Sequence, residues 1–170
     1  MDLRAENITK FLYSPNFFYA VRKAIGVLLP VVIFLGIFQK YNEGMAFAAG
    51  ALCIALIDQP GGTKKSRFNE MLAGLIMGNL AALITGLANP YPPLVLLVIC
   101  AQVFFFSMLS VYGVRGGFIG FGCMLIMMLT LSTPLTPEQA LNHTQYTLLG
   151  SVSYFLFSII SSYIFRFREE

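Results

Sequence analysis

Three arginines stand beside long apolar segments, and they are the residues best suited to bind a ligand: Arg22, Arg67 and Arg115. A guanidinium group is planar and can bind a carboxylate through two parallel hydrogen bonds. A surplus of positive charge also raises the local concentration of an organic anion. The pattern therefore indicates anion binding, and it is equally compatible with anchors whose basic side chains extend to the lipid headgroups.

A second group of polar residues lies within the apolar segments or at their ends: Asp58, Asn79 and Gln102. Asp58 could form a structural ion pair with Arg67 or with Arg115 and so close one end of a helix bundle. Asn79 and Gln102 lie deep in their segments, where a carboxamide can hydrogen-bond to a neighbouring helix or contact a substrate. We interpret all three as polar residues of a pathway or of helix contacts.

No arrangement of side chains typical of an enzyme occurs in the sequence. The only histidine, His143, lies in a predicted outer loop without an acidic or cysteine partner at a useful spacing. The chain lacks the common hydrolase, protease and nucleotide-binding motifs, and it lacks a cluster of metal ligands. We therefore expect neither catalysis nor a cofactor or metal.

Long apolar segments must position these residues. Of the 170 residues, 57% are hydrophobic and 11% are charged, whereas soluble domains carry about 25% charged residues. Six segments are apolar enough for helices that cross a bilayer: residues 21–38, 44–57, 69–87, 92–109, 116–131 and 144–165. The predicted fold class is an all-α integral membrane protein with six transmembrane helices.

The basic residues predict the orientation of these helices. Ten of the eleven lysines and arginines fall in segments on one side of the predicted membrane, and only Lys40 falls on the other. Basic residues concentrate in cytoplasmic segments, so both termini are expected in the cytoplasm.

The chain is expected to divide into three parts. Residues 1–20 form a cytoplasmic, interfacial amphipathic segment interrupted at Pro15, because aromatic and basic side chains are mixed there. Residues 21–166 form the six-helix transmembrane domain. Residues 167–170 form a cytoplasmic tail, beyond which a soluble domain could follow.

Local signals predict two further features. Thr136 and Pro137 are suited to cap and begin a short surface helix before the last crossing. Small residues four positions apart let helix backbones approach closely in lipid, and such pairs occur at Gly74 with Gly78 and at Gly116 with Gly120.

Four stretches of the chain resemble one family of membrane proteins. They are residues 18–24 (FYAVRKA), 48–62 (AAGALCIALIDQPGG), 67–74 (RFNEMLAG) and 112–120 (YGVRGGFIG). They are similar to the helix starts and the Asp/Pro/Gly turn of the fusaric acid resistance (FUSC) and aromatic acid exporter permeases. The nearest branch is the N-terminal membrane domain of inner-membrane proteins of the YccS and YhfK kind.

The resemblance implies export or conduction of organic, often aromatic, carboxylates across a bacterial inner membrane. It also implies assembly from more than one six-helix unit, so we expect a homo-oligomer, with a dimer favoured over a trimer. Lipids and the organic anion are the other expected partners, and nucleic acid is not one. The alternative hypothesis is a membrane module that transports nothing and anchors or assembles partner proteins.

Overall fold

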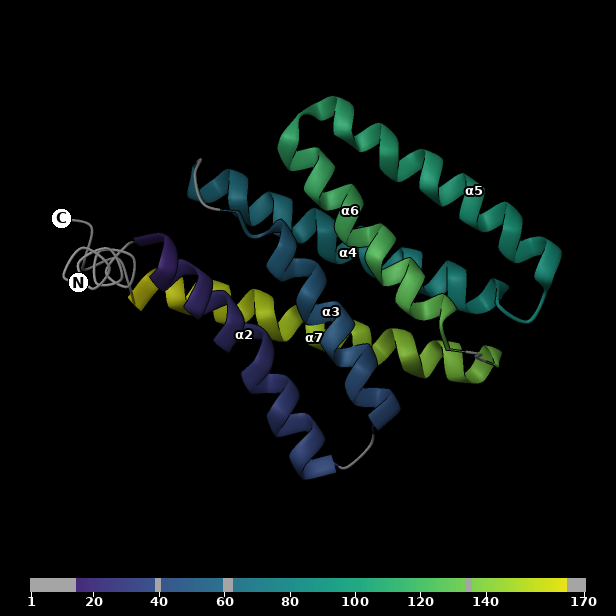
Figure 1. Cartoon of the computed structure of the whole chain (residues 1–170), viewed down its shortest axis with the longest axis horizontal. Helices are drawn as coiled ribbons and strands as arrows, with labels where there is room; N and C mark the ends of the chain where they lie inside the picture. The colour runs from purple at the N-terminus through teal and green to yellow at the C-terminus, as the bar shows by residue number, and fades with distance from the viewer. Residues whose placement is uncertain (1–14, 39–40, 60–62, 134–135, 165–170) are drawn as a thin grey trace, which may run out of the picture.

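The computed structural model describes residues 15–38, 41–59, 63–133 and 136–164 (Figure 1). Within these ranges every regular element is a helix and no strand occurs, which confirms the all-helical prediction there. The elements are α2 (Pro15–Phe38), α3 (Tyr41–Ile57), α4 (Lys64–Ala88), α5 (Pro92–Met108), the 3₁₀ helix η1 (Leu109–Tyr112), α6 (Val114–Leu131) and α7 (Pro137–Ile164). Most of the predicted interfacial segment and the predicted tail lie outside the described residues.

The helices form a bundle with α3, α4, α6 and α7 at its centre (Figure 1). Helix α2 packs on α3 and α7 at one edge, and α5 packs on α4 and α6 at the other. The core contains Ile54 and Ile57 of α3, Ile126 of α6 and Tyr154 of α7. The first turns of α2 and the last turns of α7 lie at the same end of the bundle.

Three of the described helices are long and apolar enough to cross a membrane: Lys65–Ala88, Pro92–Tyr112 and Val114–Leu131. Helix α3 is a shorter apolar helix. Only 11% of the apolar stretch of Pro92–Tyr112 is buried inside the bundle. An apolar surface of this kind is suited to contact lipid or another apolar partner. The six crossings and their orientation stay a prediction.

Several helices begin earlier than the sequence predicts, and α2 and α7 do so by the widest margin. Pro15 was expected to interrupt a segment, but it is the first residue of α2. This position suits proline because the first turn of a helix needs no amide hydrogen bond from it. The surface helix predicted to begin after Thr136 is the start of α7 itself, because no glycine or proline interrupts residues 138–149.

Glycines allow a close approach between α3 and α7. A Cβ atom at Gly50 would collide with the carbonyl oxygen of Thr147, and one at Gly150 would collide with that of Phe47. The two backbones therefore touch only because both positions lack a side chain. This crossing aligns the end of α3 with the last turns of α7.

The glycine pairs predicted from the sequence also lie at helix contacts. Gly74 and Gly78 of α4 face the side chains of Ile57 and Ile126, respectively. Gly116 and Gly120 of α6 face backbone atoms of η1 and α5. Gly113, the residue that precedes α6, makes no such contact and has φ +97°, a conformation that glycine adopts without the steric cost other residues bear.

Candidate functional site

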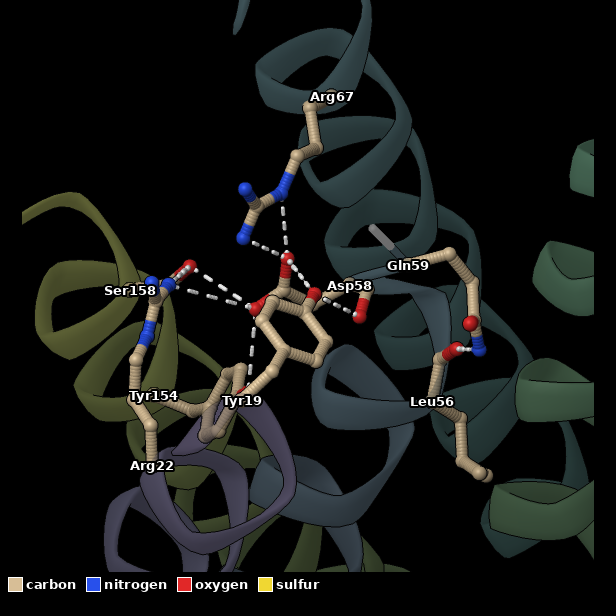
Figure 2. Close-up of polar contacts among 8 residues, drawn as sticks. All are labelled: Tyr19, Arg22, Leu56, Asp58, Gln59, Arg67, Tyr154 and Ser158. Carbon is tan, nitrogen blue, oxygen red and sulfur yellow. Dashed lines mark hydrogen bonds and ion pairs between the residues drawn. The ribbon is translucent and has the colours of Figure 1, made fainter. Parts of the chain in front are cut away.

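Four helices converge on the carboxylate of Asp58, which directly follows the last residue of α3 (Figure 2). Its main-chain N–H donates to the carbonyl oxygen of Ile54 at 2.9 Å, so the helical path continues through it. The residue is 0% exposed. A buried carboxylate is costly unless it is paired and hydrogen-bonded, and the surrounding side chains supply those partners.

Arg67 of α4 is the main ionic partner of Asp58. Its Nε donates to Oδ1 of Asp58 at 2.6 Å, and its Nη2 is ion-paired with the same oxygen. Arg67 lies in the first turn of α4, where the Thr63 hydroxyl accepts the N–H of Ser66 at 3.3 Å and caps the helix. The cap therefore fixes the turn that carries the arginine.

Hydroxyl groups of α7 and α2 complete the shell around Asp58 (Figure 2). Tyr154 donates to Oδ2 at 3.2 Å and Ser158 donates to it at 3.1 Å. These two residues are one helical turn apart and so share a face of α7. The Tyr19 hydroxyl donates to the Asp58 carbonyl oxygen at 2.7 Å and lies 3.2 Å from Oδ1.

Arg22 of α2 contacts the same cluster more loosely. Its Nη2 lies 3.9 Å from Oδ2 of Asp58 and donates to the Ser158 hydroxyl at 3.4 Å. Its side chain is 15% exposed. Arg22 is thus a second guanidinium beside one carboxylate, and it makes no short ion pair with that carboxylate.

Three cationic side chains lie near the ring of Tyr19. The Arg22 guanidinium lies 5.6 Å from the ring centroid, the Lys23 ammonium 5.0 Å and the Arg67 guanidinium 5.7 Å. These are distances at which a cation is attracted to an aromatic face. Among the described residues, three basic side chains therefore lie around the Tyr19 ring, and two of them are paired with Asp58.

Tyr19 lies outside the membrane-spanning segment predicted for residues 21–38. Burial, reinforced by the Asp58 carboxylate, raises the pKa of the Tyr19 phenol above its ordinary value. The phenol therefore stays protonated and acts as a hydrogen-bond donor to Asp58.

Arg115 pairs with a different carboxylate. Its Nη1 lies 2.8 Å from Oε1 of Glu70 and donates to the Ser66 hydroxyl at 3.4 Å. Ser66 in turn donates to the same Glu70 oxygen at 2.7 Å. The structure thus brings Arg22 and Arg67 together at Asp58 and places Arg115 in a neighbouring cluster. Of the two ion pairs considered for Asp58, the one with Arg67 forms.

Asn79 and Gln102, the two carboxamide residues predicted to lie deep in their apolar segments, are not part of the Asp58 cluster. Gln102 of α5 donates to the Ala81 carbonyl oxygen at 3.4 Å and accepts from Thr85 at 3.2 Å, which joins α5 to α4. Asn79 donates to the Leu75 carbonyl oxygen of its own helix at 2.7 Å. Its Oδ1 is buried without a hydrogen-bond partner among the described residues.

Sequence reasoning missed three of the groups that bind Asp58: Tyr19, Tyr154 and Ser158. The spacing of Tyr154 and Ser158 places two hydroxyls on one helix face, which is a usable signal for a shared partner. Nothing in the spacing indicates which residue of another helix that partner is.

Comparison with known proteins finds one matching family. The family model described as FUSC-like inner membrane protein yccS matches residues 70–170, which is more than half of the chain. Arg22, Asp58 and Arg67 precede the matched region, whereas Arg115, Tyr154 and Ser158 lie within it. No curated protein and no solved structure gives a match. The match confirms the resemblance seen in the sequence.

Proposed function

Because the chain belongs to the family of FUSC-like inner-membrane proteins, we propose that it is a permease or channel that exports organic carboxylate anions, including aromatic ones. Family membership indicates a membrane protein with a role in transport. The carboxylate substrate and the direction of transport are our proposal.

The Asp58 cluster is the observation that supports a carboxylate as substrate. The protein already holds one carboxylate there with a guanidinium, three hydroxyl donors and a nearby aromatic ring. The same groups suit the carboxylate and the ring of an aromatic acid. The three basic side chains near the Tyr19 ring favour the approach of an anion.

We assign different roles to the two guanidiniums at Asp58. Arg67 makes the short ion pair and is held by Asp58, which acts as an internal counter-ion that keeps the site ordered without substrate. Arg22 is the looser partner at 3.9 Å and is the group proposed to bind the substrate carboxylate. Arg115, paired with Glu70, contributes to the positive potential around them.

The charge distribution supports a cytoplasmic location for this site. All six basic residues of the described ranges lie at the bundle end that carries Asp58: Arg22, Lys23, Lys64, Lys65, Arg67 and Arg115. Basic residues of inner-membrane proteins concentrate on the cytoplasmic side. The proposal therefore includes six crossings with both termini inside.

The exposed apolar surface of α5 supports assembly into a homo-oligomer, with a dimer favoured. Leu97 and Phe104 of this helix are 64% and 68% exposed. Cys100 lies between them on α5 and is also exposed. A membrane-permeant bismaleimide should therefore cross-link native Cys100 into a dimer, and a Cys100→Ser variant should abolish that product. An exclusively monomeric product would oppose an α5-mediated dimer.

Transport can be tested with purified protein in liposomes loaded with radiolabelled benzoate. We expect saturable efflux of benzoate and none of neutral benzamide. Arg22→Gln should lower the efflux rate about tenfold or more, because hydrogen bonds to charged groups contribute roughly 1.5–3 kcal/mol. The matched control is Lys65→Gln, which removes an exposed charge from the same end and should change the rate less than about twofold.

The proposal of carboxylate export is wrong if well-folded protein moves none of a broad panel of aromatic and aliphatic acids. A stable complex with another polypeptide, captured in native lipids, would then favour the anchoring or assembly module.

A further inference from the structure

Two cysteines from different helices meet in the interior of the bundle, where α3 packs on α6 (Figure 1). Cys53 of α3 is 1% exposed and Cys123 of α6 is 0% exposed. Both are free thiols, and the thiol of Cys53 interacts with that of Cys123. The two residues are far apart in the chain, so only the packing of the two helices forms this pair.

Glycines of α4 and α6 create the space around the two sulfur atoms. A Cβ atom at Gly78 would lie 3.4 Å from Sγ of Cys53 and 3.9 Å from Sγ of Cys123. Both sulfur atoms therefore border the same small space between α3, α4 and α6. A Cβ atom at Gly122 would lie 3.1 Å from Sγ of Cys53 and 3.4 Å from its carbonyl oxygen. The backbone beside Cys123 thus lies against that of Cys53, and a disulfide requires such a close approach of two backbones.

The surroundings of the two thiols are apolar. Ile54 and Ile126 belong to the core cluster that contains Cys53, and Phe106 belongs to the cluster that contains Cys123. An unpaired charge is costly in such an interior. A pair of thiols and a disulfide are both neutral, so conversion of one into the other places no charge there.

We propose that Cys53 and Cys123 form a redox pair that hydrogen peroxide converts to an intramolecular disulfide. In the first step one thiol sulfur attacks the peroxide, the O–O bond breaks, and a sulfenic acid and one water result. In the second step the other thiol sulfur attacks the sulfenic sulfur and loses its proton. An S–S bond forms, the S–O bond breaks and the oxygen leaves as a second water. Two thiols are oxidised and one peroxide is reduced to two waters.

The disulfide would tie α3 to α6 close to the Asp58 cluster. Asp58 follows Cys53 by five residues, or about 7.5 Å of helix, so the bridge fixes the end of α3 that carries the carboxylate. In proteins that face the cytoplasm, disulfides are usually transient or sense oxidants. Hydrogen peroxide is small and neutral and can reach a buried pair, whereas glutathione is large and charged. Burial therefore favours oxidation of the pair over its rapid reduction.

The test uses the full chain with Cys100→Ser in lipid nanodiscs, so that only Cys53 and Cys123 carry thiols. After treatment with hydrogen peroxide, the remaining thiols are labelled with a maleimide under denaturing conditions. We expect the intact mass to fall by that of two hydrogen atoms and no maleimide to be added. A peptide map without reductant should show Cys53 joined to Cys123, and dithiothreitol should restore both thiols.

Thermal unfolding gives a second measurement. The bridged protein should unfold about 5 °C or more above the reduced protein, because the cross-link restricts the unfolded chain. Cys53→Ala and Cys123→Ala, each combined with Cys100→Ser, are the matched controls. Peroxide should cause neither the loss of two hydrogen atoms nor the rise in unfolding temperature in these variants.

Two free thiols after peroxide treatment of folded protein, or disulfides that join only separate chains, would overturn the proposal. A bridge without any rise in unfolding temperature would show that it does not tie α3 to α6 in the folded bundle, and would overturn it as well. Neither measurement uses flux, so the outcome is independent of whether the protein transports carboxylates.

Discussion

The hydroxyl of Ser158 donates a hydrogen bond of 3.1 Å to Oδ2 of Asp58, although a hundred residues separate the two in the chain. The contact joins the last turns of α7 to the end of α3. It shows that the end of the bundle is organised around one carboxylate rather than around a layer of independent surface charges. Four predictions follow from this organisation and from the packing that produces it.

Loss of the Asp58 charge should destabilise the protein strongly. Asp58→Asn leaves Arg67 without its counter-ion in a buried site, and breaking such a pair costs about 3–5 kcal/mol. The measurement is the free energy of unfolding in mixed micelles. Glu138→Gln, an exposed charge removal, should change it by less than about 0.5 kcal/mol. A similar small change for Asp58→Asn would show that the pair is not important for stability.

The two α7 hydroxyls should contribute to the same interaction. Tyr154→Phe and Ser158→Ala each remove one hydrogen bond to a charged acceptor, with an expected loss of roughly 1.5–3 kcal/mol. Because they share Oδ2 of Asp58, a double-mutant cycle should give a coupling energy above about 0.5 kcal/mol. Ser153→Ala is the control, since among the described residues that hydroxyl donates to a carbonyl oxygen of its own helix and to no other group. Strict additivity would argue against a shared acceptor.

A methyl group at the α3–α7 crossing should separate the two helices. Gly50→Ala and Gly150→Ala each place a Cβ against a backbone carbonyl group that cannot move aside easily, with an expected cost of about 1–3 kcal/mol or more. Gly36→Ala meets nothing within 4 Å and should be neutral or stabilise by up to about 1 kcal/mol through helix propensity. Equal effects at the three positions in thermal unfolding would contradict the close approach.

The Arg115–Glu70 pair should tolerate exchange of its charges. The Arg115 side chain is 37% exposed, so Arg115→Glu or Glu70→Arg alone should cost only about 1 kcal/mol, mainly by like-charge repulsion. The double exchange should recover most of that loss. If the double variant is less stable than either single variant, the pair depends on a geometry that exchange cannot reproduce.

Much of the bundle could be predicted from local sequence properties. The apolar segments at residues 44–57, 92–109 and 116–131 lie close to the observed α3, α5 and α6, because apolar composition and Gly/Pro interruptions act over a few residues. The sequence also indicated that Asp58 could pair with Arg67 or with Arg115. The ion pair that forms, between Asp58 and Arg67, spans only nine positions of the chain.

The other partners of Asp58 could not be predicted in this way. Tyr19, Tyr154 and Ser158 lie 39, 96 and 100 residues from Asp58. Their spacing within a helix defines a face, but it does not define which neighbouring helix that face meets. The contact between Cys53 and Cys123 likewise depends on how α3 packs on α6.

The sequence by itself determined that the chain is helical and apolar, and that its basic residues stand at helix ends, because these are properties of short segments. Tertiary structure decided which arginines share a carboxylate: Arg22 and Arg67 meet at Asp58, and Arg115 does not. The physical reason is the packing of the helices: α2 and α4 both pack on α3 and bring their arginines to Asp58, whereas Arg115 of α6 meets Glu70 of α4. The approach of α3 and α7 at Gly50 and Gly150 aligns the end of α3 with Tyr154 and Ser158.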